Sequence, residues 1–455
     1  MKIMLRNRRF QGGAAISALE YGKLMRRMYG EGEVELVAAG QYAGVQETYA
    51  AEGIRTYDVP YFENNHPWRN LTGLIRYVRV LRRERVDLIV AIAVCNGMLH
   101  RIVSRMLGIP VLTIVPGGEI PGSFAAIMGD TPLVVFSEEN KRALTDAGYD
   151  ESRIRLITNR LVFEPQAPAH MPAAHYARPL HGEPVRLLLI SRLDGEKMRS
   201  VHYVLDCVAA LVGAHQSAGA SGATDGRPAL GGTGAAVSAS GPAALPPIRL
   251  TLLGDGDYIA EVRARAAAIN AAAGGEVVRV AGFRRDVKAH IDDAHIVFGK
   301  GRSIIEPVYH GRIAFVVNEA EQMWQCTPQT LPRLQATNFS GRALQQPDAL
   351  VLLERRIREA AAGAVDPAPL EESSAYIARM YDIRHAAAAI DGAVRALAPP
   401  TGAGRLTVLG VLRGGAEFVR IYVKLTTHYM RRAAARRRER AARTAAGPQQ
   451  RSVES

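Results

Sequence analysis

Two cations follow an apolar segment near the middle of the chain and could bind a phosphorylated ligand. Residues 185–191 are predicted to form a buried strand, and Arg192 and Lys197 lie in the turn after it. A fork-shaped guanidinium and a compact ammonium suit a diphosphate. Ligands of open α/β sheets bind outside the carboxyl ends of the strands, so these side chains would face the ligand. The alternative is two solvated surface cations.

A glycine-containing segment farther along offers a second anion site. Gly299 and Gly301 free backbone N–H groups, and Arg302 and Ser303 lead into a predicted helix whose N-terminus adds positive potential. Glu306, in this helix, is placed to accept hydrogen bonds from the two hydroxyls of a ribose. The alternative for Glu306 is a favourable charge near a helix start, with no ligand.

Two further turns follow predicted strands of the same half. Residues 254–256 read Gly-Asp-Gly, a turn that lets backbone approach a ligand closely. Gly282 and Phe283 end the next strand and offer backbone groups and a flat ring to a nucleobase. A tight turn and a core phenylalanine are the alternatives.

Strands and helices alternate in two series, which predicts an α/β protein of two Rossmann-like, doubly wound domains with a cleft between them. The strands are short, rich in Val, Ile and Leu, and do not alternate with polar residues, as is typical of buried parallel sheets. They are predicted at 2–5, 34–39, 87–93, 110–115, 132–136, 155–158, 185–191, 248–253, 277–281, 295–298 and 313–317.

Composition divides the chain into five parts. We expect an N-terminal domain at 1–163, a proline-rich linker at 164–184, a second domain at 185–375, a helix crossing back to the first domain at 376–398, and a basic tail at 399–455. Within the second domain, residues 215–247 are almost wholly Gly, Ala, Ser, Thr and Pro, which predicts a disordered insertion.

The net charge of +13 is concentrated in the tail. Residues 401–455 carry twelve Arg or Lys and three Glu, so about +9 of the charge lies there. Such a cluster favours the anionic surface of a membrane, and a solvated tail without a partner is the alternative. Nucleic acid is disfavoured because no aromatic residue interleaves with the arginines after Tyr429.

Cysteine content and the start of the chain bear on the compartment. Cys95, Cys207 and Cys326 are widely spaced, which favours small buried side chains over disulfides or a zinc site. The first residues contain no apolar run of signal-peptide length, and no eighteen apolar residues are consecutive. We therefore expect a cytoplasmic protein, peripheral on the inner face of a membrane.

In order and spacing, these segments resemble the donor half of the family 4 glycosyltransferases, enzymes of the GT-B fold (the group 1 type). The resemblance covers roughly residues 1–395. Arg192 and Lys197 match the family's Arg and Lys that neutralise the departing diphosphate, and Glu306 matches the second of its two Glu residues. Gly299 and Gly301 match the glycines between them, and Gly12 and Gly13 match the turn after the first strand.

The chain departs from the family pattern at two positions. Phe298 stands where the first Glu, which touches the donor sugar, is found in the family. Where a His-Gly pair often lies near the acceptor, this chain reads Val-Pro-Gly-Gly-Glu, and Glu119 is the nearest candidate for a catalytic or sugar-binding carboxylate. An exposed loop glutamate is the alternative.

The resemblance implies transfer of a sugar, such as a hexose, from a nucleotide diphosphate sugar to a glycan or lipid-linked acceptor, with retention of configuration and without a metal. Because the first Glu is absent, inversion of configuration, with a catalytic base from the N-terminal domain, is the alternative. Two other functions remain: a nucleotide-sugar epimerase of the same fold, and a catalytically inactive GT-B scaffold subunit.

Overall fold

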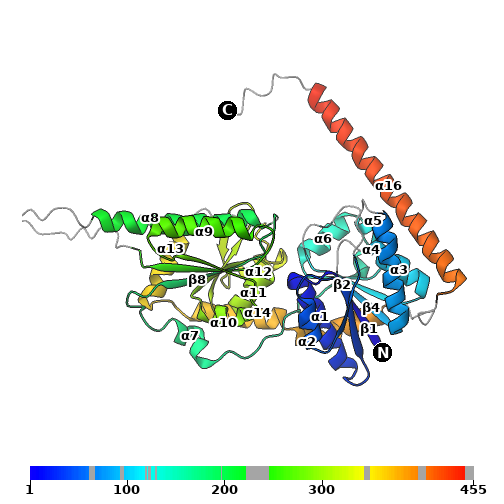
Figure 1. Ribbon diagram of the computed structural model, residues 1–455, viewed down its shortest axis with the longest axis horizontal. Coiled ribbons are helices and arrows are strands. Elements are labelled where there is room, and N and C mark those ends of the chain that lie inside the picture. The colour runs from blue at the N-terminus through cyan, green and yellow to red at the C-terminus, as the bar shows by residue number, and fades with distance from the viewer. Residues whose placement is uncertain are drawn as a thin grey trace, which may run out of the picture. The chain divides into compact units, whose positions relative to one another are not determined.

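The computed structural model describes residues 1–60, 67–92, 97–117, 120, 124–128, 131–195, 197–221, 245–342, 349–397 and 406–445. They form two compact units (Figure 1). Unit 1 contains residues 1–162 and 383–455, and unit 2 contains residues 163–382. The polypeptide therefore leaves unit 1 and returns to it.

Unit 1 is built on a parallel sheet of seven strands in the order β3-β2-β1-β4-β5-β6-β7. The central strands pair in register, with Leu5 opposite Ala38 on one side and Val90 on the other. The strands are β1 (Lys2–Arg9), β2 (Glu35–Gln41), β3 (Arg55–Asp58), β4 (Leu88–Ile92), β5 (Val111–Val115), β6 (Leu133–Val135) and β7 (Ile154–Leu156). β4, β5 and β6 are buried along their whole length, as their unbroken apolar sequence predicts.

Helices cover this sheet. One core packs α1 and the C-terminal α15 against the sheet, and another packs α3 and α4. The helices of unit 1 are α1 (Gly12–Tyr29), α2 (Gln46–Ala51), α3 (Pro67–Glu84), α4 (Gly97–Leu107), α5 (Phe124–Met128), α6 (Glu138–Asp146), α15 (Ala387–Arg395) and α16 (Val408–Ala445).

Unit 2 contains a sheet of six strands in the order β10-β9-β8-β11-β12-β13. Five strands are parallel, and β13 pairs antiparallel to β12. The strands are β8 (Val185–Ile190), β9 (Ile248–Leu253), β10 (Val278–Gly282), β11 (Ile296–Gly299), β12 (Ile313–Val317) and β13 (Met323–Gln325).

The helices of unit 2 flank this sheet and share its apolar core with the strands. They are α7 (Pro172–His175), α8 (Met198–Ser221), α9 (Ile259–Ala273), α10 (Val287–Asp293), α11 (Arg302–Tyr309), α12 (Leu331–Ala336), α13 (Ala349–Ala362) and α14 (Ala368–Tyr381). Both sheets are thus doubly wound, and the predicted α/β class is confirmed.

The proline-rich segment predicted as a linker packs within unit 2 instead. Tyr176 is buried; its hydroxyl donates to the carbonyl of His295 and accepts from the N–H of Ile313. Gln166 donates to the carbonyl of His310 at 2.7 Å. Prolines here shape an ordered path, because side chains between them reach the sheet.

Two other sequence expectations need correction. Residues 215–221 belong to α8 rather than to a disordered insertion, and residues 222–244 lie outside the described residues. A composition that cannot form a core does not by itself prevent a preceding helix from continuing by a few residues. The predicted crossing helix is two helices, α14 and α15, with a break at Asp382.

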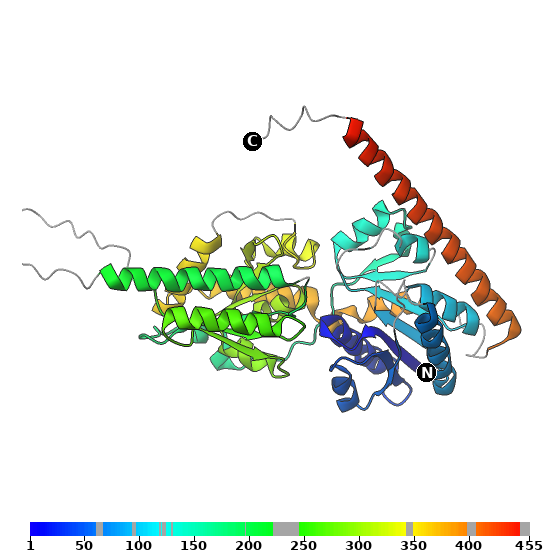
Figure 2. The ribbon, with the colours of Figure 1, turned by 45° about the horizontal axis from the view of Figure 1, so that its top comes forward.

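The tail beyond residue 399 contains the long helix α16. It packs against α4 and α5 within unit 1 (Figure 2). Among the described residues, no helix is long and apolar enough to cross a membrane.

Candidate functional site

The sheet of unit 2 has a topological switch point between β8 and β11. From β8 the chain adds β9 and β10 on one side, and then returns to add β11 and β12 on the other. The loops after β8 and β11 therefore diverge at the carboxyl edge, which is where open α/β sheets bind ligands. These two loops contain Lys197 and Lys300.

Glycines after β9 hold the loop after β8 in place. Gly254 and Gly256 both have positive φ, and a Cβ atom on them would overlap the carbonyl oxygens of Ser191 and Leu193 respectively. The backbone N–H of Leu193 donates to the carbonyl of Asp255 at 3.0 Å. The Gly-Asp-Gly turn therefore packs directly on the loop that carries Arg192 and Lys197.

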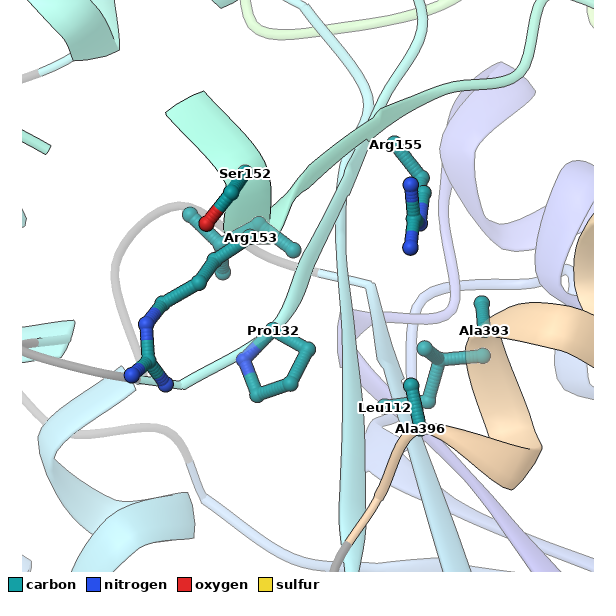
Figure 3. Close-up of a pocket in the computed structure, with 8 residues that line it drawn as sticks. Leu112, Pro132, Ser152, Arg153, Arg155, Ala393 and Ala396 are labelled. Carbon is teal, nitrogen blue, oxygen red and sulfur yellow. The ribbon is translucent and has the colours of Figure 1, made fainter. Parts of the chain in front are cut away.

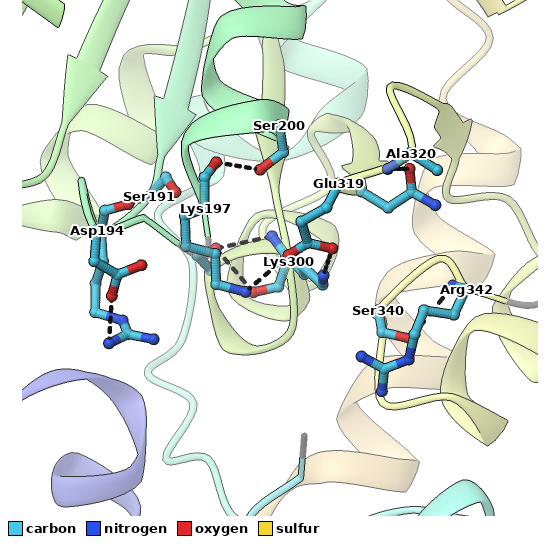
Figure 4. Close-up of polar contacts among 12 residues, drawn as sticks. Ser191, Asp194, Lys197, Ser200, Lys300, Glu319, Ala320, Ser340 and Arg342 are labelled. Carbon is cyan, nitrogen blue, oxygen red and sulfur yellow. Dashed lines mark hydrogen bonds and ion pairs between the residues drawn. The ribbon is translucent and has the colours of Figure 1, made fainter. Parts of the chain in front are cut away.

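Lys197 and Lys300 meet at one carboxylate (Figure 4). The Nζ atom of Lys197 lies 3.4 Å from Oε1 of Glu319, and Nζ of Lys300 donates to Oε2 of the same residue. Glu319 follows β12, so three loops of the carboxyl edge contribute to this cluster. All three side chains are partly buried.

The pKa values of this cluster reflect crowded positive charge. Burial, and then the charge of Lys197, lower the pKa of Lys300; Glu319 opposes them, and Arg342 adds to the lowering. Burial tends to raise the pKa of Glu319, but the hydrogen bond from Lys300 and the charges of both lysines bring it below its ordinary value. Two lysines thus share one carboxylate, and Arg342 adds positive charge near Lys300, which favours an additional anion.

Asn318 fixes the loop that carries Glu319. This buried side chain accepts hydrogen bonds from the N–H groups of Ala320 and Gln322, at 3.0 and 3.2 Å, and donates to the carbonyl of Gly341 at 3.1 Å. The same residue therefore ties Glu319 to the segment that contains Arg342.

Arg192 lies in the predicted loop and pairs with a neighbour. Its guanidinium is 2.7 Å from Oδ2 of Asp194, and nearly half of the side chain is exposed. The backbone of Asp194 also accepts from the N–H of Lys197 at 2.8 Å. Asp194 therefore orients both of the cations that the sequence singled out.

The segment after β11 forms the start of a helix as predicted, but Glu306 has a partner. Arg302 Nε donates to Glu306 at 2.7 Å along α11, while the buried Nη1 of Arg302 has no partner among the described atoms. Ser303 Oγ accepts from the N–H of Lys300 at 3.0 Å, and the N–H of Gly301 donates to the carbonyl of Phe339. The N–H groups of Lys300 and Gly301 are thus engaged within the protein.

Three other positions complete this edge. Gly299 has no room for a Cβ, because Ser303 lies against it. Gly282 has φ of 72° and accepts from the N–H of Gly254 at 2.9 Å, and the ring of Phe283 is 57% exposed. Phe298 is fully buried against Phe315, so the position of the family's first Glu faces the core.

Of the predicted site residues of unit 1, Gly12 and Gly13 lie at the carboxyl edge of its sheet. Gly12 and Gly13 begin α1 after the carboxyl end of β1, and Gly12 has φ of 69°. They lie beside the switch point of their own sheet, between β1 and β4. Glu119 lies outside the described residues.

Sequence reasoning did not select Lys300, Glu319 or Arg342. Lys300 stands inside the glycine motif, and its position between two glycines at a strand end was a usable signal. Glu319 follows β12 by two residues, so a search of every strand end for charged residues would have found it. Arg342 comes from a loop after α12 and has no such signal.

One cavity of about 160 Å³ lies in unit 1, lined by Leu112, Pro132, Arg155 and Ala396 among others (Figure 3). It is at the amino ends of β5, β6 and β7, opposite the edge where ligands bind. Its volume is below the range of small-molecule sites. It does not contribute to the candidate site.

Among the described residues, no group of three or more His, Cys, Asp or Glu side chains could hold a metal ion. Cys207 and Cys326 are buried, and burial raises the pKa of the Cys207 thiol to about 11. Cys95 lies outside the described residues.

Glycosyltransferases are among the solved structures whose fold is similar to that of this chain. HepE of Anabaena, solved with UDP and glucose, is 14% identical, with a TM-score of 0.58 over 87% of this chain and 100% of that one. The fold is GT-B. Sucrose-phosphate synthase of Thermosynechococcus elongatus (12% identical, TM-score 0.57) and a glycosyltransferase of Rickettsia africae (12%, 0.55) each cover 87% of this chain and are themselves covered over 98%.

No protein-family model matches the chain, and no curated protein matches its sequence. The similarity to GT-B structures is therefore one of fold. The predicted fold class is confirmed by it, while membership of family 4 and the roles of the site residues stay predictions.

Proposed function

We propose that the chain is a glycosyltransferase that moves a sugar, such as a hexose, from a nucleotide diphosphate sugar to a polysaccharide or glycolipid acceptor. The observation that carries the proposal is the cluster of Lys197, Lys300 and Glu319 at the switch point of a GT-B sheet. Two lysines that share one carboxylate, with Arg342 acting on Lys300, retain positive charge for a ligand.

In this proposal the lysines bind the diphosphate. A dianionic diphosphate replaces Glu319 as the partner of Lys197 and Lys300, and Arg192 adds a guanidinium from the same loop. Negative charge grows on the leaving diphosphate as the glycosidic bond breaks. Cations already held in place stabilise that charge most in the transition state, which accelerates the reaction without a metal.

The nucleoside would lie along α11 and the β10 turn. Glu306 is placed to accept from the ribose hydroxyls if Arg302, its present partner, turns its guanidinium toward the phosphates. Gly282 and the exposed ring of Phe283 offer backbone groups and a stacking surface to the base. HepE was solved with UDP and with UDP-glucose, which supports a UDP-sugar as the first donor to test.

The sugar itself must be held differently from the family 4 pattern. Because Phe298 is part of the core, no carboxylate is available at that position of β11. We propose retention of configuration by front-face attack, as the resemblance implies, with Glu119 as the candidate carboxylate on the acceptor side. Gly12 and Gly13 would provide backbone contacts there.

A donor screen tests the proposal. UDP-, GDP- and ADP-sugars are titrated calorimetrically into the full-length protein, and a UDP-sugar is expected to bind. Absence of binding to any of them would refute the proposal. Product analysis with donor alone then separates an epimerase, which interconverts the sugar without an acceptor, from a transferase.

The inactive-scaffold alternative is tested in cells. A scaffold would support glycan assembly with Arg192→Ala and Glu306→Ala both present, whereas a transferase would not. Equal abundance of the double variant and the wild-type protein, measured by immunoblot, is the required control.

A further inference from the structure

The long helix α16 packs on unit 1 with its small and charged residues inward. Gly410 and Gly414 lie against Met106 of α4, and a Cβ on either glycine would overlap that residue. One turn on, Glu417 pairs with Arg101 at 2.7 Å, and both side chains are buried. Ile421, four residues further, is fully buried. Residues that face unit 1 therefore recur every three to four positions along α16.

The opposite face of α16 is apolar and exposed. It is formed by Val408, Leu412, Val419, Tyr422, Val423 and Met430, which we call the apolar stripe. Each of these side chains is more than half exposed; for Leu412 the value is 64% and for Val419 58%. A surface helix of a globular protein normally buries its apolar side and exposes its polar side. α16 does the reverse: among the described residues the side chains of the stripe remain more than half exposed, and Tyr422 stacks on Phe418 of the same helix.

The charges on the side of α16 between the stripe and the inward face are positive. Arg413 and Lys424 lie there, at about 140° and 160° from Val408 around the helix at 100° per residue. Glu417, the acidic residue among 406–430, is already neutralised by Arg101 and Arg420. Residues 431–443 add seven arginines in sequence. An apolar stripe flanked by cations is typical of helices that lie in the interface of an anionic bilayer.

We propose that the apolar stripe of α16 binds the surface of an anionic lipid bilayer, with the helix lying parallel to the membrane. From Val408 to Met430 the stripe extends about 33 Å at 1.5 Å per residue. Because α16 is too polar to span a bilayer, a flat position is the one that buries the stripe and leaves the cations at the headgroups.

A second copy of the chain is a poorer occupant of the stripe. Parallel pairing of two α16 helices through it would bring the arginine-rich segments of both copies near each other, and like charges in proximity are unfavourable. Anionic headgroups instead neutralise them.

Vesicle flotation with the full-length protein tests this inference independently of the proposed function, since no donor or acceptor is involved. Vesicles of neutral phosphatidylcholine are compared with vesicles in which about a third of the lipid is phosphatidylglycerol. The test variant is Leu412→Ser with Val419→Ser. The matched control is Leu350→Ser with Val351→Ser, an exposed Leu and Val on α13 of unit 2.

The wild type and the α13 control are expected to float with the anionic vesicles and far less with the neutral ones. The α16 double variant should bind at least about tenfold more weakly, because burial of each apolar side chain contributes substantially to partitioning. An unchanged thermal midpoint for the double variant, by circular dichroism, establishes that it is folded.

Three results would overturn the inference. The first is failure of the wild type to bind anionic vesicles. The second is equal binding by the α16 double variant, which would assign the interaction to the arginines alone. The third is a wild-type dimer in sedimentation that becomes monomeric in the double variant, which would assign the stripe to a second copy.

Discussion

The ammonium group of Lys197 lies 3.4 Å from the carboxylate of Glu319, and Lys300 occupies the other oxygen of that carboxylate. The three residues come from three loops at one edge of the sheet. In the free protein, Glu319 thus takes the position of an anionic ligand between the two lysines. A diphosphate that binds there must displace it.

This competition predicts that Glu319→Gln tightens binding of UDP. Removing the carboxylate leaves both lysines without their internal counter-charge, so the diphosphate gains their full attraction. We expect UDP affinity, measured by calorimetry at low salt, to rise by roughly three- to tenfold. Glu321→Gln, an exposed neighbour paired with Arg199, should leave it unchanged. Weaker binding by Glu319→Gln would mean that Glu319 supports the ligand instead.

The lowered pKa of Lys300 predicts a pH dependence of UDP binding. Burial and the charge of Lys197 disfavour its protonated form, and a bound diphosphate favours it. UDP should therefore bind fully while Lys300 is protonated and lose affinity as pH rises through its lowered pKa, earlier than for an ordinary lysine. Lys300→Arg, which stays charged, should retain its affinity to higher pH. Identical alkaline profiles for the two proteins would contradict this role.

The sequence was sufficient to predict the α/β layers and the loop that carries Arg192 and Lys197. Short apolar strands and glycine turns are local signals, and strand order then places their ends together. It was not sufficient for the pairing of Lys197 with Glu319, which are 122 residues apart. Such a pair depends on the register of β12 against β11 and on Asn318, neither of which has a local signature.

The same limit applies to the C-terminal segment. Gly410 and Gly414 lower helix propensity, and nothing in the local sequence indicates the helix α16 that contains them. In the folded chain their lack of a side chain allows α16 to approach Met106 closely, so tertiary packing outweighs propensity. Tyr176 illustrates a related point, because the prolines around it suggested a free linker although its ring and hydroxyl fix the segment to unit 2.

The packing of the Gly-Asp-Gly turn predicts that Gly254→Ala destabilises unit 2. A methyl group there would overlap the carbonyl of Ser191, and φ is positive. We expect a loss of about 2–4 kcal/mol in the free energy of unfolding, measured with urea. Gly392→Ala, in α15 with nothing within 4 Å of the new methyl, should be neutral or slightly stabilising. Equal effects of the two changes would show that the turn is not tightly packed.

The buried pair between Arg101 and Glu417 predicts how α16 is held. Arg101→Met leaves the Glu417 carboxylate with Arg420 alone, and should weaken the docking of α16 by roughly 2 kcal/mol. Arg105→Met, an exposed position on the same α4 helix, is the matched control. Faster tryptic cleavage within residues 406–425 is expected for Arg101→Met only. Equal cleavage of both variants would mean that the pair contributes little.

Low pH should weaken the docking of α16 on unit 1 through the same ion pair, that of Arg101 with Glu417. The hydrogen bonds from Arg420 and Arg101 outweigh burial and lower the pKa of Glu417 to about 2. A carboxyl group whose pKa is lowered in the folded protein stabilises the folded state at pH values above its ordinary pKa. This stabilisation is lost progressively as the pH falls toward the lowered pKa. Hydrogen exchange of α16 should therefore accelerate between about pH 4.5 and 2. Glu417→Gln should abolish this dependence, and its persistence in that variant would assign it to other groups.

The central claim is that the loop after β8 binds the diphosphate of a nucleotide-sugar. Calorimetric titration of UDP into the wild type, Arg192→Ala, Lys197→Ala and Arg199→Ala tests it most directly, because Arg199 is an equally basic, exposed neighbour paired with Glu321. We predict that the wild type and Arg199→Ala bind alike, and that Arg192→Ala and Lys197→Ala each bind about ten- to a hundredfold more weakly. Equal affinity of all four proteins, or no binding of any nucleoside diphosphate by the wild type, would contradict it.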